Sequence, residues 1–168
     1  MAYRNKTYIC FDGDTDMHWY RLMTAWKDNE DHDFNFHNAH DINTARDSSE
    51  EESIKRQLRE RFANSKLLIV LIGEKTALLT KFVKWEMEVA LRLDLPIVAL
   101  NLNGSRVKDG RCPPAIRDEL VMFVPFRQKI VAYAMDNWPD QHARGRREGK
   151  TGWYYYTDET YQQLGLAA

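Results

Sequence analysis

The sequence has few cysteines, no long apolar run and no excess of charge of either sign. Cys10 and Cys112 are the only cysteines in 168 residues, and their spacing is not that of a metal-binding motif. No apolar stretch approaches the roughly 20 residues that a membrane span requires, and the first six residues form no apolar signal segment. The 24 Lys and Arg residues nearly balance the 25 Asp and Glu residues. We therefore expect a cytoplasmic protein that binds neither nucleic acid nor membrane.

The familiar short motifs for nucleotides and nucleophiles are also missing. Neither Gly-x-Gly-x-x-Gly nor Gly-x-x-x-x-Gly-Lys occurs, which excludes the Rossmann fingerprint and the P-loop. No serine stands in a nucleophile elbow, and neither cysteine has an obvious histidine partner. His37, His40 and Asp41 lack a convincing third ligand, so no metal site is predicted. Hydrophobic residues make up 43% of the chain, which is enough for a sizeable core.

Short apolar runs alternate with amphipathic segments along the chain. This order predicts a single-domain, doubly wound, flavodoxin-like α/β sheet of about five parallel strands with flanking helices. The domain is expected to span residues 1–138. Residues 139–168 are expected to form a basic loop and an aromatic tail that packs on or extends the domain. The predicted strands are 7–11, 34–36, 67–72, 97–102 and 121–124, and the predicted helices are 17–26, 49–63, 80–93, 115–120 and 128–138.

Two boundaries in this scheme depend on proline. Pro125 ends the fifth predicted strand, so that strand is expected near an edge of the sheet. Pro139 is expected to stop the last helix, which leaves residues 140–150 as a loop. Thr80 is expected to cap the helix that bears Glu86.

Glu86 is the residue of most interest in the helix predicted over 80–93. At about 100° per residue it falls in a row with Phe82, Val89 and Leu93, on the flank of the buried face. An unpaired carboxylate in such a place is costly. Two interpretations remain open: a glutamate at the rim that reaches water or an arginine, and an active-site acid.

Three loops of the predicted sheet converge on one edge. The loops at 12–16, 37–49 and 73–80 all follow strands, and ligands of open α/β sheets bind outside the carboxyl ends of the strands. The acidic loop Asp12-Gly-Asp-Thr-Asp16 allows phosphoryl transfer through Asp12 and Asp14, but it is a near miss to the haloacid-dehalogenase motif. Capping of the next helix by Asp14 or Asp16 explains the same residues. The convergence favours the functional interpretation of Glu86.

A resemblance to a known family covers about residues 6–125. The strand 67–72, Gly73 and the run Phe82-Val-Lys-Trp-Glu86-Met resemble the third strand and third helix of TIR domains. The sequence is most similar to the TIR-like branch of bacterial Thoeris anti-phage systems, with Phe11-Asp12 after the first strand and Asp47-Ser after the second. Phe82 is a departure, because the family pattern usually has Trp there, preceded by Ser.

The resemblance implies an enzyme that cleaves the nicotinamide glycosidic bond of NAD with Glu86 as the catalytic residue. NAD is then a consumed substrate and not a cofactor, and the product is ADP-ribose or a cyclic ADP-ribose isomer that signals to a separate effector. It also implies self-association and a phage-derived trigger. TIR folds that act only as interaction modules are the alternative. The residues expected to bind NAD are Phe11, Asp12, Asp14, Asn38, His40, Asp47 and Trp85.

Overall fold

The computed structural model describes residues 7–27, 36–37 and 51–166, which form one parallel sheet with helices on both faces. The strand order is β2-β1-β3-β4-β5-β6, and every neighbouring pair is parallel. This order confirms the predicted doubly wound, flavodoxin-like fold. The strands are β1 (Thr7–Cys10), β2 (Phe36–His37), β3 (Leu67–Ile72), β4 (Ile97–Asn101), β5 (Val121–Pro125) and β6 (Tyr154–Tyr155).

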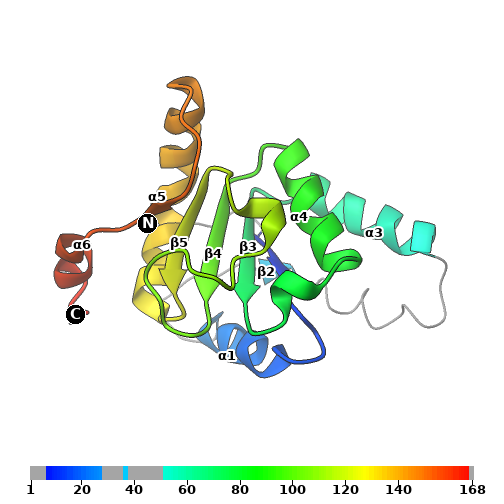
Figure 1. Cartoon of the computed structure of the whole chain (residues 1–168), viewed down its shortest axis with the longest axis horizontal. Helices are drawn as coiled ribbons and strands as arrows, with labels where there is room; N and C mark the ends of the chain where they lie inside the picture. The colour runs from blue at the N-terminus through cyan, green and yellow to red at the C-terminus, as the bar shows by residue number, and fades with distance from the viewer. Residues whose placement is uncertain (1–6, 28–35, 38–50, 167–168) are drawn as a thin grey trace.

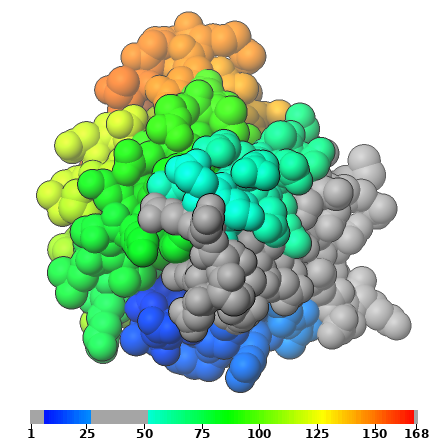
Figure 2. Space-filling model, turned by 90° about the vertical axis from the view of Figure 1, so that its right-hand side faces the viewer, coloured from blue at the N-terminus to red at the C-terminus, as the bar shows by residue number. Residues whose placement is uncertain are grey.

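The helices lie in two layers, one on each face of the sheet. Figure 1 shows α5 on one side of the sheet and α3 and α4 on the other, and Figure 2 shows α3 and α4 packed side by side. No helix of the described residues is both long and apolar enough to cross a membrane. The helices are α1 (Met17–Lys27), α3 (Glu51–Ala63), α4 (Phe82–Arg92), α5 (Gln128–Arg147) and α6 (Asp158–Gln163), with 3-10 turns η2 (Thr76–Leu78) and η3 (Pro114–Ile116).

Alternate side chains of the central strands point to opposite faces of the sheet and belong to two separate hydrophobic cores. All six residues of β3 are buried, as the uninterrupted run Leu67–Ile72 predicts for a strand covered on both faces. One core joins the sheet to α1, α5 and the C-terminal segment. The other joins the sheet to α3 and α4. Because every strand pair is parallel, the carboxyl ends of the strands and the loops that follow them lie at the same edge of the sheet.

Most predicted elements occur, with small shifts at their ends. β3 has the predicted bounds. Of the predicted second strand 34–36, only Phe36 is among the described residues, and it lies in β2 together with His37. The predicted helix 115–120 is only the 3-10 turn η3. Capping of α4 by Thr80 is wrong, because the helix begins at Phe82 with Lys81 as its N-cap and no side-chain cap bond.

The helix predicted to stop before Pro139 instead continues to Arg147, and the loop predicted over 140–150 is wrong. Pro139 removes one backbone donor, but residues beyond it pack against the domain. His142 and Gly145 are buried, and Gly145 lies against Leu120. Tertiary packing thus outweighs the local cost of the proline. The division of the chain at residue 138 stays a prediction about domains, and α5 runs across that position.

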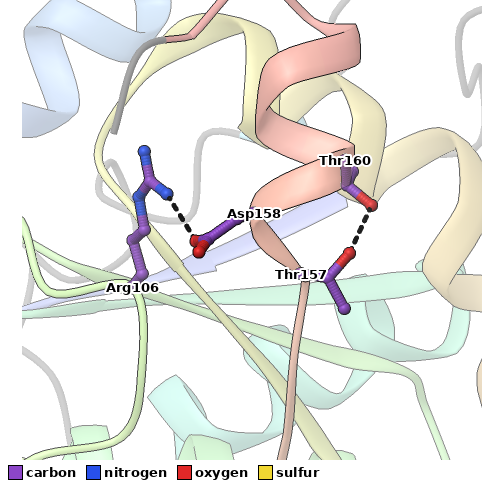
Figure 3. A network of polar contacts seen from close by, with 4 residues as sticks. All are labelled: Arg106, Thr157, Asp158 and Thr160. Carbon is purple, nitrogen blue, oxygen red and sulfur yellow. Dashed lines mark hydrogen bonds and ion pairs between the residues drawn. The ribbon is translucent and has the colours of Figure 1, made fainter.

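The aromatic tail supplies a sixth strand that sequence analysis missed. β6 pairs with Met122 and Phe123 of β5 and is itself the edge strand. β5 is therefore the next-to-last strand, and its predicted position near an edge of the sheet is confirmed. Beyond β6, the chain is tied back to the loop that follows β4. Arg106 contacts Asp158 at 3.3 Å, as Figure 3 shows, and its guanidinium lies 3.8 Å from the ring centroid of Tyr161.

Candidate functional site

Glu86 lies in the first half of α4 and faces the sheet. Only 1% of the residue is exposed, so its interpretation as a solvated glutamate at the rim is wrong. Helix α4 runs from Phe82, and its buried residues face the core shared with α3. Burial of a charged carboxyl group costs free energy unless polar neighbours stabilise it. The neighbours of Glu86 on β1 therefore show how its charge can be stabilised.

Tyr8 of β1 is a polar neighbour of Glu86 that sequence analysis missed. Its ring is fully buried and stacks on Phe62 of α3, with centroids 4.0 Å apart. Burial raises the pKa of the Tyr8 hydroxyl well above its ordinary value, and the charge of Glu86 raises it further. The hydroxyl therefore stays protonated at neutral pH and can donate to a carboxylate. Alternation along β1 sets Tyr8 and Cys10 on the same face, which is the signal that could have identified Tyr8.

Trp85, next to Glu86, packs toward α3. Its ring lies 6.3 Å from that of Phe62, at a steep angle, and the ammonium of Lys55 lies 5.6 Å from its centroid. The indole is half-buried, which leaves part of it accessible. Trp85 thus borders the Tyr8–Phe62–Glu86 cluster from the α3 side, and its role in NAD binding stays a prediction.

Phe11 lies on the opposite face of the sheet. It belongs to the core shared with α1 and α5, and its ring centroid is 4.7 Å from that of Tyr20 in α1. The structure therefore does not bring Phe11 and Trp85 together, although both are expected to bind NAD. Three other predicted NAD-binding residues, Asn38, His40 and Asp47, lie outside the described residues.

The acidic loop after β1 is a tightly bonded turn. The carboxylate of Asp12 accepts hydrogen bonds from the backbone N–H of Asp14 at 3.0 Å and from the hydroxyl of Thr15 at 2.6 Å. Asp12 is buried and Asp14 is exposed. These bonds show that Asp12 stabilises the turn that leads into α1. Its expected contact with NAD, like that of Asp14, stays a prediction.

Asp16 and Gly73 show that two of the predicted loops meet at the carboxyl edge. Asp16 is 5% exposed and packs directly on Gly73, the residue after β3. The backbone N–H of Gly73 donates to the hydroxyl of Thr76, which itself donates to the carbonyl of Leu71. This convergence was predicted from the order of strands and loops, and for these two loops it is confirmed.

A hollow of about 320 Å³ opens beside Asp16. It lies between the loop after β1, the loop after β3 and the end of β4. Glu86 does not line it. The lining residues are Thr15, Asp16, His18, Trp19, Gly73, Glu74, Lys75, Leu102 and Arg111.

The family model for the TIR-like domain of the Thoeris protein ThsB matches residues 8–107. The chain belongs to this family. A comparison with curated proteins finds no match. The matched region contains Tyr8, Glu86, Asp16 and the hollow beside it, except for Arg111. The long α5 and the strand β6 lie outside the matched residues 8–107.

Within this ThsB-type domain, the described residues include no group of three or more His, Cys, Asp or Glu that could hold a metal ion. The polar groups that the structure brings together are instead a buried carboxyl with a tyrosine hydroxyl on α4 and β1, and a second buried carboxyl with cations at the carboxyl edge. Glu86 and Tyr8 lie between α4 and the sheet, whereas Asp16 lies at the hollow beside α1.

Asp16 should make stability depend on pH in a defined direction. Burial raises the pKa of Asp16 above its ordinary value of 3.8, and the nearby charge of Asp12 raises it further. A carboxyl whose pKa is raised by folding disfavours the native state once the unfolded chain ionises. The cost is therefore absent below pH 3.8, grows between pH 3.8 and the raised pKa of the folded state, and is constant above that pKa. Asp16→Asn, which keeps the shape, should raise the melting temperature at pH 7 more than at pH 4.

Thermal melts followed by circular dichroism at both pH values test this prediction. Asp14→Asn is the control, because Asp14 is exposed in the same turn. Equal effects of Asp16→Asn at the two pH values would show that ionisation of Asp16 has no cost in the folded state.

Proposed function

We propose that this ThsB-type domain cleaves the nicotinamide glycosidic bond of NAD and converts the rest into a cyclic ADP-ribose-type signal. The observation that carries the proposal is the position of Glu86: a carboxyl group 1% exposed, on α4 within the family-matched region, beside the hydroxyl of Tyr8. Membership of a Thoeris family supports a role in anti-phage defence. In this proposal the signal acts in the cytoplasm on a separate effector, and a phage-derived trigger with self-association starts turnover.

The chemistry requires a carboxylate near the ribose of the substrate. When the bond between the ribose carbon and the nicotinamide nitrogen breaks, its electron pair leaves with nicotinamide and positive charge develops on the ribose. The carboxylate of Glu86 stabilises that charge, and it does so more strongly in buried surroundings than in water. Water, or a nucleophilic atom of the same molecule, then bonds to the ribose carbon and loses a proton. The first gives ADP-ribose and the second gives the cyclic product.

Tyr8 supports Glu86 in this role. Because its hydroxyl stays protonated, it can hold the buried carboxylate by donating to it without adding negative charge. The stack on Phe62 fixes the tyrosine ring, so the hydroxyl has a defined position. Tyr8 is therefore a positioning residue for Glu86 in the proposed reaction.

Incubation of the purified protein with NAD tests the activity. We expect release of nicotinamide, which chromatography measures. Mass spectrometry should show a second product whose mass is that of ADP-ribose less one water. The reaction should be run alone and with lysate of infected cells, because the proposed enzyme is triggered. Failure to release nicotinamide under both conditions would contradict NAD cleavage, whereas release with only linear ADP-ribose would contradict cyclisation alone.

A non-catalytic interaction module is the second candidate function, and one surface observation favours it. Leu78 of η2 is 74% exposed, and its chain neighbours Ala77 and Leu79 line a small hollow of about 100 Å³ that also includes Thr80 and Lys84. A large exposed apolar side chain beside a partly apolar hollow is a feature that an association site would use. Such a surface is also compatible with an enzyme that self-associates. The variants of Glu86 described in the Discussion separate the two functions.

A further inference from the structure

The hollow at the carboxyl edge carries an inference that does not depend on cleavage of NAD. It lies where three strand ends meet, on the side of α1. Strand order reverses between β1 and β3, because the chain passes from β1 outward to β2 and then returns to β3 on the other side. In sheets of this kind, that point is where a crevice for ligands forms. Glu86, by contrast, faces the core shared by α3 and α4.

Asp16 is the residue that indicates a ligand. It is 5% exposed, and its carboxyl group borders the hollow. Its Oδ2 is buried and receives no hydrogen bond from any of the described residues. A buried carboxylate oxygen without a donor is costly, and Gly73 beside it has no side chain that could supply one. Oδ2 itself is shielded by its packing on Gly73, so a ligand hydroxyl in the hollow would stabilise the carboxyl group as a whole.

The other charged groups narrow the class of ligand. Lys75 and Arg111 line the hollow together with two acidic residues, Asp16 and Glu74. The formal charges therefore balance, and the site is not simply a site for anions. A ligand that suits it carries neutral hydroxyl donors for Asp16 and an anionic group for the two cations. Ribose phosphates combine these groups, and the volume of about 320 Å³ suits a molecule of mononucleotide size.

Trp19 supplies the remaining surface. The indole lines the hollow and is fixed by Phe126, whose ring centroid lies 5.0 Å away at a steep angle. A half-buried, immobilised aromatic ring is a surface on which a nucleobase can stack. Leu102 adds a second apolar contact at the end of β4.

We propose that this hollow binds a ribonucleoside monophosphate, with its ribose hydroxyls on Asp16, its phosphate near Lys75 and Arg111, and its base against Trp19. This site is separate from Glu86, so it is a second nucleotide site of the domain. A nucleotide bound there contacts the turn into α1 and the loop that leads into α4.

Isothermal titration calorimetry of the whole chain with adenosine monophosphate tests the proposal. We expect saturable binding, a loss of affinity of about tenfold or more for Asp16→Asn, and unchanged affinity for Asp118→Asn, whose exposed carboxyl does not line the hollow. Lys75→Met should weaken binding of the monophosphate but not of adenosine, and Lys81→Met, at an exposed lysine nearby, should change neither. The 2′-deoxy monophosphate should bind at least about tenfold more weakly, and inorganic phosphate should not compete at equal concentration.

Glu86→Gln distinguishes this site from the proposed catalytic one. It should bind the monophosphate as the unaltered chain does, even if NAD cleavage is lost or was never present. Absence of saturable binding at millimolar nucleotide would overturn the proposal. Equal affinities of Asp16→Asn and the unaltered chain would overturn it too, as would loss of binding in Glu86→Gln with retention in Asp16→Asn.

Discussion

Replacement of Glu86 by glutamine should reduce nicotinamide release from NAD by about a hundredfold to a thousandfold. Glutamine keeps the size of the side chain but cannot carry the negative charge that stabilises the ribosyl cation. Loss of one preorganised electrostatic group in an active site typically costs this much. The effect should appear in kcat, because the charge interacts with the transition state more strongly than with bound NAD. Release of nicotinamide under triggered conditions, measured over a range of NAD concentrations, gives the result.

Glu88→Gln is the matched control for this experiment. Glu88 is on the same helix, and the substitution is again glutamate to glutamine. Unlike Glu86, Glu88 is only half-buried and lies on the outer charged face of α4. Its replacement should leave turnover within about twofold of the unaltered protein, since surface substitutions rarely have larger effects. Circular dichroism must show that both variants are folded.

The same pair of variants separates the enzyme from the interaction module. If Glu86→Gln is folded and protects cells from phage as well as the unaltered protein does, then catalysis by Glu86 is not required and the association surface around Leu78 becomes the better explanation. If protection is lost with Glu86→Gln and kept with Glu88→Gln, the enzyme is supported. Loss of protection in both variants would contradict a specific role for Glu86.

The central strands could be predicted because their apolar runs leave few alternatives. Leu67–Ile72 is uninterrupted and bounded by Gly73, and it is buried along its whole length in the structure. The helix that bears Glu86 was predicted from the 3.6-residue period. The predicted position of Glu86 on the flank of the apolar face is consistent with its burial in the structure. The resemblance to a Thoeris TIR-like family is confirmed by the match to residues 8–107.

What the sequence did not reveal depends on contacts between distant segments. Pro139 is a valid local signal for a helix end. The contact that overrides it joins Gly145 to Leu120, which are 25 residues apart in the chain, and the periodicity of the sequence does not reveal such a contact. The strand β6 has only two residues and becomes a strand only by pairing with β5. Tyr8 looks like an ordinary strand residue until the fold places it beside Glu86. Site residues that face each other across elements are therefore the hardest to predict.

Gly73→Ala should destabilise the domain by about 1–3 kcal/mol, the usual cost of forcing extra atoms into a packed site. A Cβ atom at this position would lie only 2.3 Å from Oδ2 of Asp16. The backbone cannot retreat easily, because the N–H of Gly73 is bonded to the hydroxyl of the buried Thr76 at 2.9 Å. For a chain of this size, such a loss lowers the melting temperature by several degrees, at about 2–4 °C per kcal/mol.

A double variant shows whether Asp16 is the cause. In Asp16→Ala/Gly73→Ala the carboxyl that the new methyl group would meet is absent, so the two changes together should cost less than the sum of their separate effects. Gly110→Ala is the control, since nothing lies within 4 Å of a Cβ there and its melting temperature should hardly change. Denaturant unfolding of the single and double variants measures the coupling. If the effects simply add, the loops after β1 and β3 are not held together by the contact of Asp16 with Gly73, and the hollow that they frame has a different shape from the one in this structure.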